Sequence, residues 1–325
     1  MKKILNLALL CTAIGGLAQL PAVAQESLAS NPITIVVPFS PGGATDTTAR
    51  LLAKKMAEES GYQFIVENKP GAGGNIAAAY IARAKPDGHS LLFATTNTNG
   101  INSYIYPNLN YDAVDSFTPV GFVAENVVVM LANTSFPANN LTEALTVLKA
   151  QPGHYSYASP GVGTVHQVAM ELLKHKEGLD VLHIPYKGAG PAMIDPVAGT
   201  VPLMMGGIAP ALPFIASGKV KILAVANDRR FKNISKDVQY FSDVVPDAAV
   251  SSWMGLLAPK GTPPADIAKL SEALQKALAS KELTDALEQQ GMQSEYMPPD
   301  QFGKLISDGM VFWKKAAQNI KLEQN

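Results

Sequence analysis

The chain has 325 residues, of which 47% are hydrophobic and 16% are charged, and its formal net charge is −1. This length exceeds one typical domain, and the composition is too apolar for a disordered chain. The balanced charge, without a basic stripe, excludes a nucleic-acid-binding protein. We therefore expect two packed domains.

The first 24 residues have the three-part pattern of an export signal. Lys2 and Lys3 precede a mostly apolar run, and the small residues Ala22 and Ala24 follow it. A membrane anchor is the alternative, but polar residues and glycines interrupt the run, whereas a spanning helix needs about 20 mostly apolar residues. We predict cleavage after Ala24 and a periplasmic mature protein. Cleavage removes two lysines and no acids, so the net charge changes from −1 to −3.

The single cysteine, Cys11, lies inside this export segment. Leu10 precedes it, where a lipoprotein signal needs a small residue. The mature chain therefore has no disulfide, thiolate metal site or cysteine nucleophile. No later segment is apolar for long enough to span a bilayer. We expect a monomer without a membrane insertion, without a cofactor and without a metal.

Beyond the export segment, short β-rich apolar runs alternate with amphipathic helical stretches, which is typical of parallel α/β layers. A first series predicts strands at 33–37, 63–67 and 91–95, with a helix after each of the first two. A second series predicts a helix at 141–150 and strands at 127–131, 155–158, 181–184, 201–205 and 220–226. A strand begins at Trp253, and helices then continue to the C-terminus.

The two series predict two domains, and the chain crosses between them twice. We expect one crossing near Met130 and the return near Ser252, with the last helices packed on the first domain. The predicted domains are therefore 25–130 plus 252–325, and 131–251. Two crossings would form a hinge.

Three strand-to-helix loops, at 41–46, 71–75 and 159–164, are rich in glycine. Such loops present backbone N–H groups at a helix N-terminus and suit anions such as carboxylates. The alternative is that the glycines only let the chain reverse. Because the loops fall on both sides of the crossing near Met130, we expect them to line a cleft between the domains. None contains arginine, so amides, hydroxyls and waters would hold the carboxylate.

Sequence signatures of enzymes are absent: there is no G-x-S-x-G, Walker or H-E-x-x-H motif, and the five histidines have no metal-ligand spacing. Ser159 with His166 is the single local pair that suggests a hydrolase. We predict a binding protein and not an enzyme.

Four segments resemble the receptors of tripartite tricarboxylate transporters, the Bug family. They are 38–46 with Ala49 and Arg50, 68–74, 159–164 with His166, and 185–192 with Asp195. The resemblance implies a type II periplasmic-binding-protein (Venus flytrap) fold, with two α/β domains and a two-crossing hinge. It also implies a small carboxylate as ligand and membrane transporter subunits of the tripartite tricarboxylate type as partners. A periplasmic sensor that presents the same ligand to a signalling protein is the alternative function.

The resemblance also implies the binding residues. On one side these are Phe39, Gly42, Gly43, Ala44 and Asp46, with Gly74 of the second loop; on the other they are Ser159, Gly163, Thr164, His166, Tyr186 and Asp195. The far end of the ligand is expected to meet Thr96, Asn97 and Asn102, whose alternative role is to make turns. Asp46 is expected to cap the following helix, to hold bridging waters, or to do both. Pro196 departs from the family pattern and puts the Asp195 contact in doubt.

Overall fold

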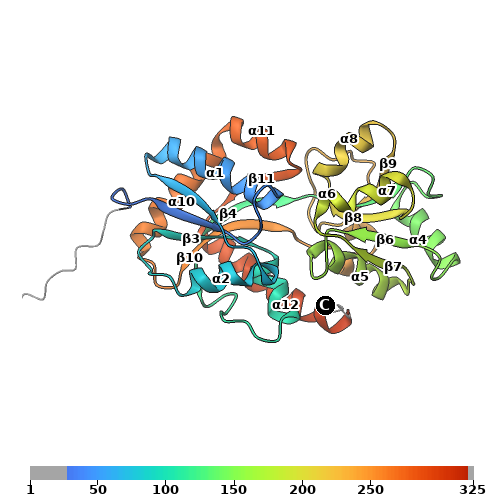
Figure 1. Ribbon diagram of the computed structural model, residues 1–325, viewed down its shortest axis with the longest axis horizontal. Helices are drawn as coiled ribbons and strands as arrows, with labels where there is room; N and C mark the ends of the chain where they lie inside the picture. Colours follow the sequence, from blue (N-terminus) through green and yellow to red (C-terminus); the bar gives the residue numbers. More distant parts are fainter. Residues whose placement is uncertain (1–27, 321–325) are drawn as a thin grey trace, which may run out of the picture.

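The computed structural model describes residues 28–320. Cys11 and the predicted cleavage site after Ala24 therefore lie outside the described residues. The described chain forms two lobes side by side, each a sheet covered by helices (Figure 1). This is the expected architecture of two α/β domains joined by two crossings.

The first domain contains a six-stranded sheet of order β11-β4-β10-β3-β1-β2. Its strands are β1 (Ile33–Val37), β2 (Phe64–Asn68), β3 (Ser90–Thr95), β4 (Phe117–Asn126), β10 (Trp253–Pro259) and β11 (Met292–Met297). Its helices are α1 (Ala44–Ser60), α2 (Asn75–Ala82), α3 (Asn102–Ile105), α10 (Pro264–Ala279), α11 (Lys281–Gln289) and α12 (Pro299–Asn319), with short turns η1 (Ala72–Gly74) and η2 (Asn97–Ile101). The β-branched run of β1 is buried between β2 and β3, which explains its mostly apolar sequence.

The second domain contains a five-stranded sheet of order β7-β6-β8-β5-β9. Its strands are β5 (Val128–Asn133), β6 (Ser156–Ser159), β7 (Leu182–Pro185), β8 (Leu203–Gly207) and β9 (Val220–Val225). Its helices are α4 (Leu141–Ala150), α5 (Val165–Glu177), α6 (Ala189–Ala192), α7 (Ile194–Ala198), α8 (Leu212–Ala216) and α9 (Phe241–Val244), with turns η3 (Ala209–Ala211) and η4 (Pro246–Ala248).

Both sheets contain antiparallel as well as the expected parallel pairs, so the layers are mixed. β1 pairs in parallel with β2 and β3, but β10 is antiparallel to both β3 and β4. The second domain repeats this arrangement, since β5 is antiparallel to β8 and β9. The reason is topological: the chain leaves the first domain along β4 and returns along β10, so these neighbours run in opposite directions.

The crossings lie between β4 and β5 and between β9 and β10. The two crossing segments are hydrogen-bonded to each other, because Asn126 N–H donates to the Ser252 carbonyl at 2.9 Å. The exact domain limits near Met130 and Ser252 stay a prediction; the strands themselves change sheet at Val127.

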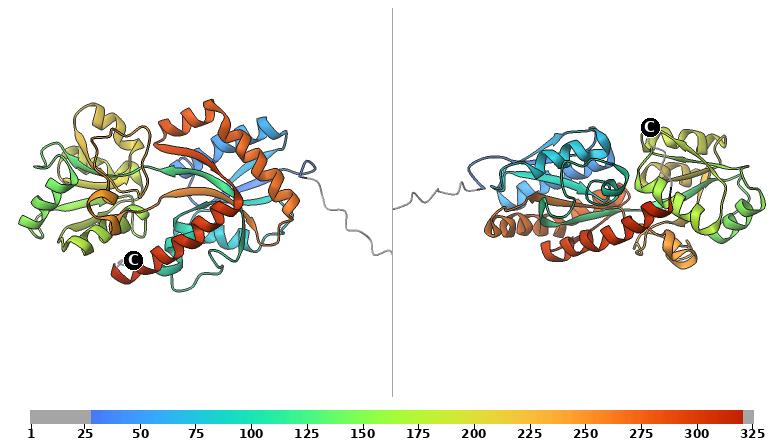
Figure 2. Two further views of the ribbon diagram at one scale, coloured as in Figure 1. Left: turned by 180° about the vertical axis from the view of Figure 1, so that it is seen from behind. Right: turned by 90° about the horizontal axis from the view of Figure 1, so that it is seen from below.

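The helix α12 connects the two domains a third time. Phe302 and Ile306 near its start pack in the core of the first domain. Trp313, Ala316 and Ile320, at its end and just beyond, pack in the core of the second. The left view of Figure 2 shows this helix running from one lobe to the other. Of the last helices, α10 and α11 pack on the first domain as expected, whereas α12 packs on both domains.

Candidate functional site

The first glycine loop is held in place by Asp46. Its buried carboxylate accepts the Gly42 N–H at 2.9 Å and the Asn68 side-chain amide at 2.8 Å, and Arg50 lies 3.0 Å away. Burial opposes ionisation, but the hydrogen bonds from Arg50, Gly42 and Asn68 outweigh it and lower the pKa of Asp46. All of these contacts fold the loop, so this carboxylate acts on the loop itself.

The anchored loop leaves backbone donors at the start of α1. Ser40 to Ala44 are exposed, Phe39 is half-buried, and no side chain caps the helix at Gly43. The first N–H groups of a helix have no partner within it, and the dipole of this 17-residue helix favours an anion there. The loop can therefore accept a carboxylate through its main chain.

The second loop packs directly against the first. A Cβ on Gly74 would lie 2.7 Å from Thr98 Cγ2 and 2.9 Å from Pro38 Cβ, and Gly74 has a φ of +96°. Only glycine fits this close approach. Asn102 fixes the loop from the other side, because its Nδ2 donates to the Gly73 carbonyl at 2.9 Å.

The three residues expected at the far end of the ligand lie in different environments. Thr96 is buried and bonded to the main chain of Trp253. Asn102 is fully buried, and its Oδ1 has no partner among the described residues. Asn97 is half-buried and donates through Nδ2 to the Gly163 carbonyl at 2.8 Å. Asn97 therefore reaches across to the second domain, whereas Thr96 serves the turn that holds it.

The third loop is organised by Gln167, which the sequence reasoning missed. Gln167 Oε1 accepts the Gly163 N–H at 2.7 Å, and Thr164 caps α5 by accepting the Gln167 N–H. The spacing of Thr164 and Gln167 is that of a capping box, which is the sequence signal that could have found it. Arg50 and Asn68 belong to the segments that resemble the receptor family, but nothing in the sequence indicates that their side chains bind Asp46.

The predicted pair of Ser159 with His166 is not formed. Ser159 Oγ lies 2.7 Å from His183 Nε2 instead. Gln167 Oε1 accepts the Gly163 N–H, which fixes the orientation of the Gln167 amide. Gln167 Nε2 therefore lies 3.1 Å from His183 Nδ1 and donates to it. A neutral His183 ring therefore carries its proton on Nε2, and a protonated ring has no acceptor. In neither form can it take a proton from Ser159, so this pair is not a nucleophile and base.

His166 lies in the first turn of α5. Its ring nitrogens are buried without a hydrogen-bond partner among residues 28–320. Burial lowers the pKa of His166 to about 4, so the ring is neutral at pH 7. It offers no positive charge to an anion.

On the remaining side, Tyr186 donates a short hydrogen bond to Asp195 Oδ2. Burial and this carboxylate raise the pKa of Tyr186 to about 12. Pro196 follows Asp195 in the first turn of α7, where a missing N–H costs nothing. The departure at Pro196 therefore leaves the Tyr186–Asp195 pair intact.

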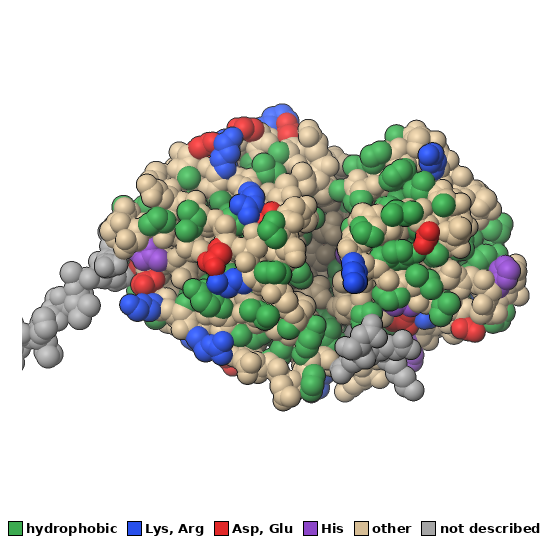
Figure 3. Space-filling view, viewed as in Figure 1, with side chains coloured by type: hydrophobic (Ala, Val, Ile, Leu, Met, Phe, Trp, Pro, Cys, Tyr) green, Lys and Arg blue, Asp and Glu red, His purple; other side chains and the backbone are tan. Residues whose placement is uncertain are grey.

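The three loops come together where the domains face each other. The first two touch through Gly74 and Pro38, and the third meets η2 and α3 through Asn97 and Ile105. Figure 3 shows the furrow between the two domains on this face. No helix within the described residues is long and apolar enough to cross a membrane, and no metal-binding group of His, Cys, Asp or Glu is found among them.

Comparison with known proteins assigns this arrangement to a family. The profile described as tripartite tricarboxylate transporter family receptor matches residues 48–322. The chain belongs to this receptor family. The receptor is 30% identical to Protein BugT of Bordetella pertussis over 292 residues, which cover 90% of each chain. The resemblance to Bug receptors is therefore confirmed.

Two solved structures share the fold of the receptor. MatC of Rhodopseudomonas palustris, with bound malate, is 33% identical, with a TM-score of 0.75 over 88% of this chain and 98% of that one. Rpa4515 of R. palustris, with adipate, is 28% identical, with a TM-score of 0.79 over 89% and 97%. The receptor is thus a solute-binding protein with the periplasmic-binding-protein fold.

Proposed function

We propose that the receptor captures a small carboxylate in the furrow between its domains. The observation that carries this proposal is the uncapped, exposed N-terminus of α1, beside two further glycine loops from both domains. The malate and adipate found in the two related structures support the same ligand class.

The contacts divide into two groups. The exposed main chain of Gly43 and Ala44 would bind the carboxylate, with Thr164 on the facing loop, whereas the Gly42 N–H is donated to Asp46 and shapes the loop. Asp46 and Ser159 are almost fully buried and would position the loops. Tyr186 and Asp195 would contribute to the wall of the furrow that the second domain forms. Asn97 would contact the far end of the ligand.

We further propose that the protein is exported, cleaved after Ala24, and delivers its ligand to tripartite tricarboxylate-type membrane subunits. A pull-down with those subunits, in the presence of ligand, tests this partnership. Capture of a signalling protein in their place would favour the sensor function.

A thermal-shift screen tests the ligand class. The refolded mature protein, freed of carried-over cargo, is measured against carboxylates including malate and adipate, with amines and sugars for comparison. A ligand at 100-fold above its Kd should add about 2.7 kcal/mol of stability. Stabilisation by amines or sugars alone would contradict the proposal.

One variant tests the main-chain contact directly. Ala44 is the first residue of α1 and follows Gly43 at φ −77° and ψ 167°, a conformation compatible with a following proline. Ala44→Pro therefore deletes one N–H donor without distorting the helix, and Ala44→Ser keeps that donor as control. We expect binding to weaken about tenfold in Ala44→Pro alone. Equal affinity of the two variants would remove the Ala44 N–H from the site.

A further inference from the structure

A second cavity, of about 560 Å³, lies at the hinge. Its walls come from both crossings and from α12, and they include Glu125, Asp228, Arg229, Trp253, Phe312 and Trp313. None of these residues belongs to the glycine loops of the carboxylate site. The volume is within the range of small-molecule sites, about 300–1,000 Å³.

The polar end of this hinge cavity has more carboxylates than cations. Arg229 is shared, because its Nε lies 3.6 Å from Glu125 and its Nη2 lies 2.5 Å from Glu295. Asp228 adds a third carboxylate beside this single guanidinium. Burial and the charge of Asp228 raise the pKa of Glu125 to about 7, despite hydrogen bonds from Asn227 and Ser252. An added cation would relieve this excess of negative charge.

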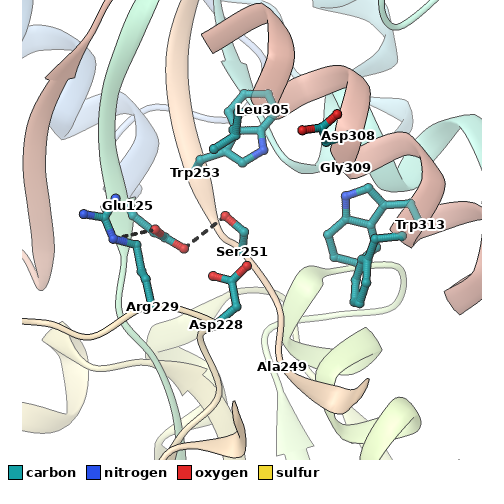
Figure 4. Close-up of a pocket in the computed structure, with 11 residues that line it drawn as sticks. Glu125, Asp228, Arg229, Ala249, Ser251, Trp253, Leu305, Asp308, Gly309 and Trp313 are labelled. Atoms are coloured by element: carbon teal, nitrogen blue, oxygen red, sulfur yellow. Dashed lines mark hydrogen bonds and ion pairs between the residues drawn. The ribbon is translucent and has the colours of Figure 1, made fainter. Parts of the chain in front are cut away.

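The other end is aromatic. Figure 4 shows the carboxylates of Glu125 and Asp228 on one side and the indole of Trp313 on the other, with Asp308 near the indole. Trp253 and Phe312 complete the apolar wall with Leu305. Aromatic faces attract cations, and an apolar wall of this size fits an apolar body. Because the described residues hold no metal-binding cluster, a metal ion fits the cavity poorly.

We propose that the hinge cavity is a second binding site, for a small organic ammonium ion. The ammonium group lies against Glu125 and Asp228, and its apolar body lies against Phe312 and Trp313. Glu125 lies in β4 of the first domain, and Asp228 lies in the crossing segment that follows β9 of the second domain. Occupancy of the cavity is therefore linked to the angle between the domains.

Tryptophan fluorescence provides a local readout, because Trp253 and Trp313 are the two tryptophans of the chain. The mature protein is titrated with cyclohexylammonium, which has a charge and an apolar body and does not fluoresce. Cyclohexanol has the same body without the positive charge. We expect a saturable change with cyclohexylammonium and a much weaker response to cyclohexanol.

Charge-removing variants localise the effect. Glu125→Gln keeps an acceptor for Asn227, and Asp228→Asn provides a second test if the buried substitution impairs folding. Asp285→Asn, in an exposed ion pair of α11, is the matched control. We expect cyclohexylammonium binding to weaken at least about tenfold in the first two variants and not in the third. No saturable response, an equal response to cyclohexanol, or equal weakening in Asp285→Asn would overturn the proposal.

Discussion

At the scale of single residues, the most informative side chain is Asp46. In the sequence it is an acid in a loop expected to bind an acid, which is puzzling for an anion site. In the structure it takes hydrogen bonds from Gly42, Arg50 and Asn68, so its charge is neutralised within the loop. The carboxylate thus folds the main chain into an anion-binding shape and leaves the N–H groups of α1 to the ligand.

Asp46→Ala should therefore weaken carboxylate binding by about tenfold or more, because the loop loses the acceptor that holds it. The fold should survive, since the loop is at the surface. Calorimetric titration with a carboxylate from the screen, compared with Asp285→Ala, measures the effect. Unchanged affinity would show that the loop keeps its shape without Asp46.

His166 should make stability depend on pH. Its folded pKa, about 4, lies below the usual 6.5, so the unfolded chain binds the extra proton first as pH falls. The contribution of His166 to the free energy of unfolding is therefore fully present above pH 6.5, and it is lost as the pH falls toward 4. Between pH 7.5 and pH 5 the expected loss is about 2 kcal/mol.

Urea unfolding of the wild type and His166→Gln at both pH values measures this effect. The loss of stability in the wild type must be compared with the loss in the variant, because Glu125 also titrates over this interval. Its pKa is raised to about 7, so its protonation stabilises the fold of both proteins as the pH falls. We expect the wild type to lose about 2 kcal/mol more than the variant. Equal losses would mean that the ring of His166 is solvated in the folded protein.

At the scale of elements, the glycine loops show why a turn signal and a binding signal look alike. In the second loop, Gly71, Gly73 and Gly74 all have positive φ, as a reversal of the chain requires. Gly74 has an additional role that no turn needs, because Thr98 and Pro38 leave no space for a Cβ. The glycine content of the sequence indicates the positive φ angles of the turn, but it does not indicate the close contact at Gly74.

Gly74→Ala tests the packing role against a matched control. Gly218→Ala also places an alanine at positive φ, but nothing lies within 4 Å of its Cβ. The control should cost about 1–2 kcal/mol for backbone strain, and Gly74→Ala should cost about 1–3 kcal/mol more for overpacking. Chemical denaturation gives both values, and equal costs would contradict the close contact. Binding of a carboxylate should weaken in Gly74→Ala alone.

Two strands were not predicted, and each has a physical reason. β4 contains Pro119 and Gly121, which normally argue against a strand. Pro119 lies where the pairing with β10 shifts register, and Gly121 makes room for Leu274 of α10. β11 is a half-exposed edge strand between two helices, and half of its residues are polar. Both strands depend on partners distant in the sequence.

At the scale of the whole molecule, the two domains are joined by the crossings, by α12 and by the contact of Asn97 with Gly163. Closure around a ligand should bring the facing loops together while the crossing segments bend. Small-angle scattering should therefore show a smaller radius of gyration when a carboxylate from the screen is added. A radius that stays constant at saturation, shown in parallel by calorimetry, would argue against a moving hinge.

The sequence by itself determined the local elements and the family. Strand β1, helix α1 with its glycine stop, and helix α4 follow from short-range periodicity, and the glycine motifs identify the receptor class. Only the tertiary structure decided what the polar side chains do. Asp46 accepts a hydrogen bond from Asn68, Ser159 contacts His183, and α12 spans both domains, because each of these partners is contributed by a different segment of the chain. Hydrogen bonds and packing act through space, and local sequence patterns do not contain those distances.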